Sequence, residues 1–343
     1  MLGIAELKEN IEITAATVEC PVKGCNEKVK RQRVTFKKEE RFKCPMHNIY
    51  ISPSTFEYPS DLDNLLWKEK ADLDLFEGIK RVKRERRIAR DNSEDAVSWN
   101  VFRFLERNNL VGDFLKEICN SPVINPEVIY WSYSQSQQRA WDELLKAKVE
   151  FGEATNARAA IARGSEPDLI VKSEAALFFI EAKLRSTNKT PSPTNPKVQT
   201  NYVKGGTNWW NQVFRSDFET VAIDAKKYEL SRFWLIGTWI AKQLNLDFYL
   251  LNLVRSEKEK DIESVFKKHV KENHQKKFAR ISWEDIYGYI SNSNLYGRDK
   301  GVIIRYLKNK TVGYENGKLQ KAFSIPNIED GEEAEMKEEE IKL

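Results

Sequence analysis

Three charged side chains flank two short apolar segments near the middle of the chain. Asp168 precedes the apolar run 169–171, and Glu181 and Lys183 follow the run 176–180. Both runs have the length and the partly β-branched composition of strands, and the polar tripeptide between them can turn. The sequence therefore predicts a β-hairpin with two carboxylates and one ammonium at its open end.

The spacing of these residues indicates a specific chemistry. Side chains alternate along a strand, so Glu181 and Lys183 share a face, and the hairpin brings Asp168 beside them. Two carboxylates can hold Mg2+, which polarises a phosphoryl oxygen and activates a bound water. Lys183 can orient or deprotonate that water, or offset charge on phosphorus. The small Ala182 leaves its carbonyl oxygen able to reach the metal.

This arrangement resembles the Pro-Asp…(Asp/Glu)-x-Lys motif of the PD-(D/E)XK nuclease superfamily, with Asp168, Glu181 and Lys183 at the motif positions. The resemblance implies a restriction-endonuclease-like α/β fold, in which helices flank a central mixed β-sheet. It also implies hydrolysis of DNA phosphodiesters with Mg2+ or Mn2+ as cofactor. A further acidic ligand often comes from the helix before the sheet in this superfamily, and Glu94 is the candidate. Glu94 could equally be a first-turn acid that only favours the helix dipole.

A second set of residues suits a structural zinc ion. Cys20 and Cys25 are separated by four residues, and Cys44 and His47 by two. Two such ligand pairs on turns form the tetrahedral Cys3His set of a closed zinc site. The linking segment 26–43 alternates apolar and basic residues and is predicted to form a hairpin. Residues 1–58 as a whole resemble the N-terminal zinc modules of some restriction-endonuclease-like proteins.

The charge distribution suggests a polyanionic partner. Residues 329–343 contain eight acids and two lysines, and the remaining chain has 54 basic and 44 acidic residues. A basic body favours nucleic acid, and the acidic tail has the composition of a solvated end. The basic run 80–90 contains Arg84, Arg86 and Arg87, which are the candidate DNA contacts. The alternative is that this run forms an exposed helix face.

Composition points to the cytoplasm and away from membranes. No apolar run approaches the length of a membrane span, and the N-terminus has no secretory signal pattern. The four cysteines are unevenly spaced and do not suggest a disulfide framework.

The chain is expected to contain several segments with different roles. Segment 186–208, rich in Pro, Ser, Thr, Asn and Gly, is expected to be a long loop beside the catalytic end of the sheet. The predicted organisation is a zinc module at 1–58, a basic helical connector at 59–91, a nuclease core at 92–294, an appendage at 295–328 and an acidic tail at 329–343.

These features favour a metal-dependent endonuclease that acts on double-stranded DNA in restriction or defence, and a homodimer would suit cleavage of both strands. One alternative keeps the fold and assigns repair, recombination or RNA cleavage. Another is a zinc-containing DNA-binding protein without catalysis. Asp168 and Glu181 argue against that alternative, because a binding module has no need to hold two like charges together.

Overall fold

The computed structural model of the 343-residue chain describes residues 6–52, 54–83, 87–119, 122–162 and 166–325. The chain forms two compact units. Unit 1 contains residues 1–68, 87–104 and 282–343, and unit 2 contains residues 69–86 and 105–281. Each unit joins segments that are far apart in the sequence. The domain boundaries given above stay predictions.

Unit 2 is built on a mixed sheet whose described strands follow the order β11-β10-β9-β8-β5-β6-β7. β9 pairs with β10 in parallel, and the pairs β8–β9, β5–β8, β5–β6 and β6–β7 are antiparallel. The predicted mixed sheet of an α/β fold is therefore confirmed. The strands are β5 (Glu127–Tyr130), β6 (Tyr133–Ser134), β7 (Arg139–Ala140), β8 (Leu169–Lys172), β9 (Ala176–Ala182), β10 (Asp247–Val254) and β11 (Lys276–Ser282).

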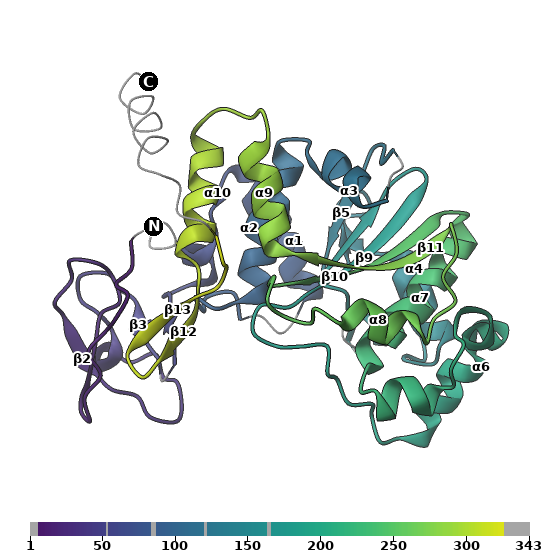
Figure 1. The fold of residues 1–343 in the computed structure, drawn as a ribbon, viewed down its shortest axis with the longest axis horizontal. Helices are drawn as coiled ribbons and strands as arrows, with labels where there is room; N and C mark the ends of the chain where they lie inside the picture. Colours follow the sequence, from purple (N-terminus) through teal and green to yellow (C-terminus); the bar gives the residue numbers. More distant parts are fainter. Residues whose placement is uncertain (1–5, 53, 84–86, 120–121, 163–165, 326–343) are drawn as a thin grey trace. The chain divides into compact units, whose positions relative to one another are not determined.

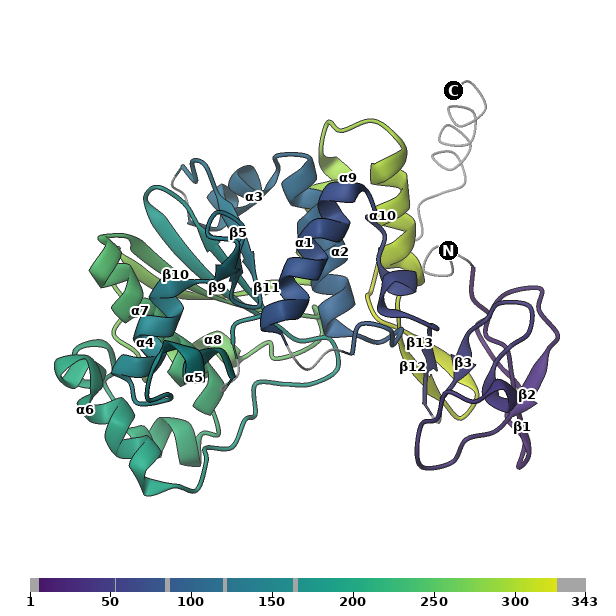
Figure 2. The ribbon, with the colours of Figure 1, turned by 180° about the vertical axis from the view of Figure 1, so that it is seen from behind.

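Helices cover both faces of this sheet, as predicted. Figures 1 and 2 show α4, α6, α7 and α8 on one side of the sheet and α3 on the other. The helices of unit 2 are α1 (Lys70–Val82), α3 (Val111–Cys119), α4 (Asp142–Glu150), α5 (Ala157–Ala162), α6 (Pro196–Val213), α7 (Tyr228–Leu244) and α8 (Ile262–Lys267), with a π-helical turn at Glu219–Asp224.

The core of unit 2 explains why β9 is an almost unbroken apolar run. Leu177 and Phe179 join the core cluster that includes side chains of α7, while Phe178 points the other way and stacks on Tyr249 at a ring separation of 4.9 Å. All four side chains are buried. A strand covered on both faces needs apolar residues at every position, so alternation is lost until the charged end is reached.

Unit 1 brings residues 9–11 together with residues 317–319. The Ile11 N–H donates to the Gly317 carbonyl and the Leu319 N–H donates to the Glu9 carbonyl. Leu319 also joins the small apolar core around the cysteines. The described elements of unit 1 are β1 (Thr17–Glu19), β2 (Lys28–Lys30), β3 (Tyr50–Ile51), β4 (Phe56–Glu57), α9 (Trp283–Asn292), α10 (Arg298–Asn309), β12 (Thr311–Glu315), β13 (Lys318–Lys321) and the 3-10 turns Glu40–Phe42 and Asp61–Asn64. The division between the two units falls within α2 (Glu94–Arg107).

Two local predictions are wrong. Segment 186–208 is only partly a loop, because α6 begins at Pro196. A proline fits the first helical position, where its missing N–H has no helical partner, and the Asn195 side chain caps the helix by accepting from the Lys197 N–H. Segment 26–43 does not fold as a hairpin, since β2 pairs with β1 outside that segment.

None of the helices in the described part of the chain is both long and apolar enough to cross a membrane.

Two helical glycines make a matched test of this packing. A Cβ added at Gly237 of α7 would overlap the Phe248 ring, whereas a Cβ at Gly288 of α9 meets no atom within 4 Å. We expect Gly237→Ala to lower the free energy of unfolding by about 1–3 kcal/mol, the usual range for overpacking. Gly288→Ala should raise it by about 0.5–1 kcal/mol, because alanine favours a helix. Chemical denaturation measures both free energies. A Gly237→Ala protein with the same free energy of unfolding as the wild type would contradict the packing of α7 on β10.

Candidate active site and metal centre

The predicted hairpin is present and places the motif residues at its open end. β8 and β9 pair with Leu169 opposite Ile180, which brings Asp168 opposite Glu181 in the next register step. The Ala182 N–H donates to Asp168 Oδ2 at 2.9 Å. The Lys183 N–H donates to the Leu253 carbonyl at 2.7 Å, so β9 stays held to β10 as far as the motif lysine.

The charged groups at this end are nearly enclosed. Lys183 Nζ donates to Glu181 Oε1 and lies 3.1 Å from Glu229 Oε2, at the start of α7. The exposed fraction is 4% for the Glu181 side chain and 11% for the Lys183 side chain. Two carboxylates thus contact one ammonium in a largely desolvated site, where charge interactions are stronger than in water.

Burial and neighbouring charge perturb both titrating groups. Burial first, and then the charge of Asp168, raise the pKa of Glu181 well above its usual range. Burial disfavours the Lys183 ammonium, but the negative charges of Glu181, Asp168 and Glu229 outweigh it and raise the pKa of Lys183. Lys183 therefore remains a cation near neutral pH in this setting, which favours a role as a fixed charge over a role as a base.

One oxygen of the site is buried without a partner. Glu181 Oε2 has no hydrogen-bond partner among the described residues. A buried acceptor in this position is costly unless a donor or a cation satisfies it. With Asp168 opposite in register, this oxygen fits a site that binds a hard cation through carboxylates.

An amide network lies beside Glu181. Asn252 of β10 is its register partner on the neighbouring strand. The Asn188 side chain donates to Asn252 Oδ1 at 2.6 Å and to Glu259 Oε2 at 2.7 Å. The Asn188 N–H also donates to Glu259, at 2.9 Å. These contacts fix the segment that leaves β9, so the site has a firm support on the β10 side.

The predicted catalytic residues fall into two groups. Asp168, Glu181 and Lys183 come together in unit 2, with Ala182 between the last two. Glu94 begins α2 in unit 1, where Ser93 Oγ caps the helix by accepting from the Ala96 N–H. Whether Glu94 serves the site stays a prediction.

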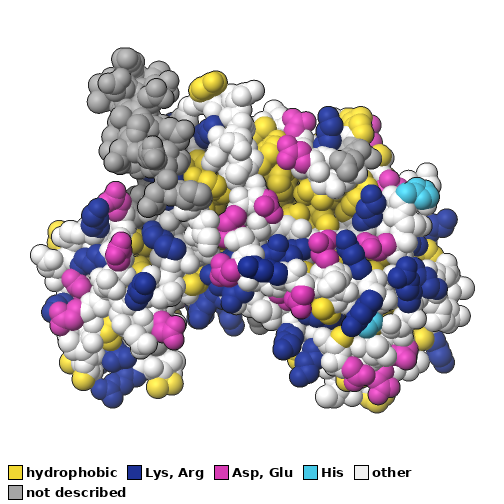
Figure 3. All heavy atoms as spheres, viewed as in Figure 1, with side chains coloured by type: hydrophobic (Ala, Val, Ile, Leu, Met, Phe, Trp, Pro, Cys, Tyr) yellow, Lys and Arg dark blue, Asp and Glu magenta, His cyan; other side chains and the backbone are white. Residues whose placement is uncertain are grey.

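The candidate DNA contacts are only partly described. Arg84 and Arg86 lie outside the described residues, and Arg87 is exposed. Figure 3 shows one face of the molecule, on which Lys and Arg side chains over the region of α6 and α8 are interspersed with Asp and Glu. The basic character of the chain is thus spread over a mixed-charge surface on this face.

Sequence reasoning missed Glu229 and Asn252. Glu229 lies in the first turn of α7, where an acid is common because it favours the helix dipole, so nothing in the sequence distinguishes it. Asn252 did leave a signal, because it interrupts the otherwise apolar strand β10. A polar residue at a buried strand position usually has a specific partner.

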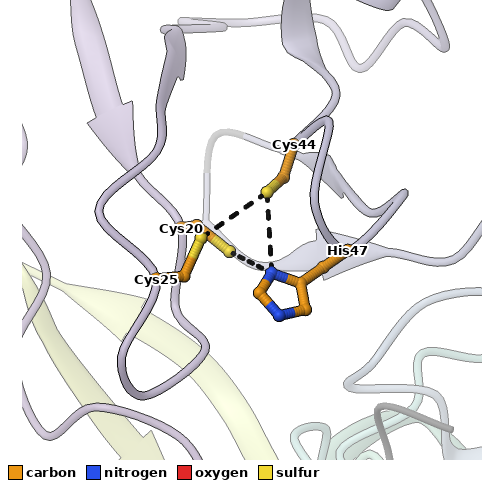
Figure 4. A group of neighbouring side chains, drawn as sticks. All are labelled: Cys20, Cys25, Cys44 and His47. Carbon is orange, nitrogen blue, oxygen red and sulfur yellow. Dashed lines mark hydrogen bonds between the residues drawn. The ribbon is translucent and has the colours of Figure 1, made fainter.

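The predicted zinc ligands form a compact group. Among the described residues, one set of at least three His, Cys, Asp or Glu side chains has ligand atoms within 4.8 Å of one another, and it consists of Cys20, Cys25, Cys44 and His47. Figure 4 shows the three sulfurs and His47 Nδ1 facing a common centre. These four side chains could hold a metal ion.

The spacing of the ligand atoms suits a tetrahedral ion. His47 Nδ1 lies 3.6 Å from Cys20 Sγ and 3.7 Å from Cys44 Sγ, and the Cys25 and Cys44 sulfurs are 3.9 Å apart. A tetrahedral zinc with ordinary bond lengths separates its ligand atoms by about 3.5–3.8 Å. All four positions come from the protein, which is typical of a structural site.

Tight turns create this geometry. Gly24, at φ +80°, turns the chain between the first two cysteines, and Asn48, at φ 54°, does so after His47. The Asn48 N–H donates to the Cys44 carbonyl at 2.8 Å, which closes the second turn. Burial raises the pKa of the Cys20 and Cys44 thiols, so a metal cation is needed to favour their thiolate forms.

No family model matches the chain, and no curated protein or solved structure matches it. The function must therefore be argued from the residues and their geometry.

The Cys3His group predicts a bound zinc ion that can be measured. Purified protein should contain about one zinc per chain, and Cys44→Ser should lose it, because a hydroxyl is a much weaker zinc ligand than a thiolate. Cys119→Ser is the matched control, since Cys119 lies in α3 of unit 2 and is not one of the four predicted ligands. Elemental analysis measures the metal, and limited proteolysis should show faster cleavage within residues 15–55 of Cys44→Ser alone. If elemental analysis finds no zinc in carefully prepared wild-type protein, the prediction is wrong.

Proposed function

We propose that this protein is a divalent-metal-dependent nuclease of the restriction-endonuclease-like kind, acting on DNA. The observation that carries the proposal is the meeting of Asp168, Glu181 and Lys183 at the end of the β8–β9 hairpin. The residue types match the PD-(D/E)XK motif that they resemble, and the mixed sheet flanked by helices is compatible with that fold.

Each residue has a role that follows from its position. Asp168 and Glu181 would hold Mg2+, together with the Ala182 carbonyl. When bound, the metal would polarise a phosphoryl oxygen and lower the pKa of a coordinated water. Hydrolysis forms a bond between a water oxygen and phosphorus and breaks a phosphorus–oxygen bond to a sugar, whose oxygen leaves with a proton. The Lys183 ammonium would stabilise the negative charge that develops on the phosphate oxygens.

The zinc module and the basic chain support a nucleic-acid substrate. Once residues 329–343 are set aside, basic residues outnumber acidic residues by ten. A structural zinc would stabilise the N-terminal fold, which carries many lysines and arginines able to contact phosphates. Double-stranded DNA in a restriction or defence role remains the preferred substrate, and RNA or repair intermediates are alternatives within the same chemistry.

The proposal is tested by incubating the protein with plasmid DNA and Mg2+, with EDTA as the control. Asp168→Asn should abolish cleavage and leave DNA binding intact, since it removes a metal-binding charge while the amide oxygen can still accept from the Ala182 N–H. Lys183→Ala should slow cleavage by about 10²–10³-fold, the usual effect of losing one electrostatic stabiliser. Asp142→Asn, which alters an exposed ion pair with Arg139, is the matched control and should stay active.

The outcomes separate the candidate functions. Cleavage of RNA but not of DNA would favour the RNA nuclease. DNA binding without any Mg2+-dependent cleavage would favour a zinc-containing binding protein. Cleavage that survives both Asp168→Asn and Lys183→Ala would place the chemistry elsewhere in the chain.

The pH dependence of cleavage follows from the raised pKa of Glu181. An acid with a raised pKa keeps its proton to a higher pH, and the protonated form cannot hold the metal. Cleavage should therefore be weak at low pH and rise with a midpoint above 4.5, the ordinary value for this group. Raising the Mg2+ concentration should lower the midpoint, because metal and proton compete for one carboxylate. A midpoint that does not respond to Mg2+ would exclude Glu181 as a metal ligand.

A further inference from the structure

Lys183 contacts a carboxylate that is not part of the nuclease motif. Its Nζ lies 3.1 Å from Glu229 Oε2, and the exposed fraction of the Glu229 side chain is 17%. The ammonium is thus placed between Glu181 on β9 and Glu229 on α7.

The segment that follows β9 fixes the position of Glu229. The Glu229 N–H donates to Thr190 Oγ1 at 2.9 Å, so Thr190 caps a first-turn N–H of α7, where the helix itself supplies no acceptor. The Thr190 N–H in turn donates to the Lys226 carbonyl at 2.8 Å. Asn188 anchors the same segment through Glu259 and Asn252. The chain that leaves the motif therefore returns to hold the start of α7 against it.

A second anchor fixes α7 itself. Arg232, one helical turn after Glu229, donates through Nε and a terminal nitrogen to the two oxygens of Glu153, at 2.5 and 2.6 Å. Both side chains are almost fully buried, and the Tyr202 hydroxyl donates to the same carboxylate at 2.6 Å. A bidentate, buried pair of this kind has a specific geometry. Glu229 is therefore presented to Lys183 from a rigid element.

We propose that Glu229 is a positioning residue that keeps the Lys183 ammonium directed at the reacting phosphate. The inference rests on the proposed nuclease function. A carboxylate that shares its charge with Mg2+ attracts a neighbouring ammonium less strongly, so Glu181 alone holds Lys183 poorly once it binds metal. Glu229 supplies a carboxylate for Lys183 that is outside the predicted ligand pair Asp168 and Glu181.

Glu229 acts through Lys183 and not as a metal ligand. Among the described residues, the Cys3His set is the group of three or more His, Cys, Asp or Glu side chains whose ligand atoms lie within 4.8 Å of one another, so Glu229 does not form such a triad with Asp168 and Glu181. The Glu229 carboxylate contacts the Lys183 ammonium at 3.1 Å. Substitution of Glu229 should therefore alter the cleavage rate and the Mg2+ affinity only when Lys183 is present.

A double-mutant cycle tests this role with two readouts. The variants are Glu229→Gln, Lys183→Ala and their combination, with Glu229→Asp as the conservative variant. Glu263→Gln, which alters an exposed pair with Lys267 in α8, is the matched control. Plasmid cleavage gives the rate, and calorimetric titration with Mg2+ in the absence of DNA gives metal affinity. Thermal unfolding reports whether each variant is folded.

Glu229→Gln should slow cleavage by about tenfold, as expected for loss of a charged hydrogen bond, and Glu229→Asp should recover part of the rate. Glu229→Gln should also weaken Mg2+ binding, because Lys183 then pairs with Glu181 alone and competes with the metal. Lys183→Ala should bind Mg2+ more tightly than wild type. In that background Glu229→Gln should change neither readout.

Other outcomes overturn the inference. A Glu229→Gln protein that matches Glu263→Gln in rate and Mg2+ affinity shows that Glu229 does not position Lys183. An effect that persists in the Lys183→Ala background shows that Glu229 acts directly on the metal or the substrate. If Asp168→Asn is inactive while Glu229→Gln is fully active, only this inference fails. If the wild type never cleaves with Mg2+, the proposed function fails, and the calorimetric cycle still decides whether Glu229 acts through Lys183.

Discussion

The site depends on the position of β9 inside the sheet of unit 2. β9 pairs with β8 on one side and with β10 on the other, and its side chains are buried on both faces. Polar groups within such a strand would be costly, so charge is confined to its end. There the motif carboxylate Glu181 is nearly enclosed, and its charge must be balanced by a cation. The contact with Lys183 and the unsatisfied oxygen of Glu181 both follow from this constraint.

Buried ion pairs surround the motif and hold the adjacent elements. Arg232 pairs with Glu153, and the fully buried Lys148 lies 2.7 Å from Glu166, two residues before Asp168. Such pairs contribute little net stability, because desolvation offsets much of the Coulomb attraction. Removing one partner is costly, however, so they specify geometry. This is consistent with a site whose charged groups must keep fixed positions relative to one another.

Unit 1 is stabilised differently. Its cysteine-rich segment has short strands and a small apolar core that includes Leu319 from the other end of the chain. A metal ion held by the Cys3His group would supply much of the folding free energy of a segment of this size. The four ligands lie on two tight turns, whose backbone geometry is set by Gly24 and Asn48. The two units thus place potential metal ligands in different ways, on turns in unit 1 and at a strand end in unit 2.

The sequence by itself determined the hairpin, its charged end and the clustering of Cys20, Cys25, Cys44 and His47, and the resemblance that its motif carries implied the mixed α/β sheet. These features depend on local periodicity and short spacing, which a sequence displays directly. Tertiary structure alone decided that Glu229 contacts Lys183 and that Ile11 and Leu319 share one core. Those contacts join residues 46 or more positions apart, and each residue is locally unremarkable. The start of α6 at Pro196 was hidden for another reason, because proline favours both a loop and the first turn of a helix.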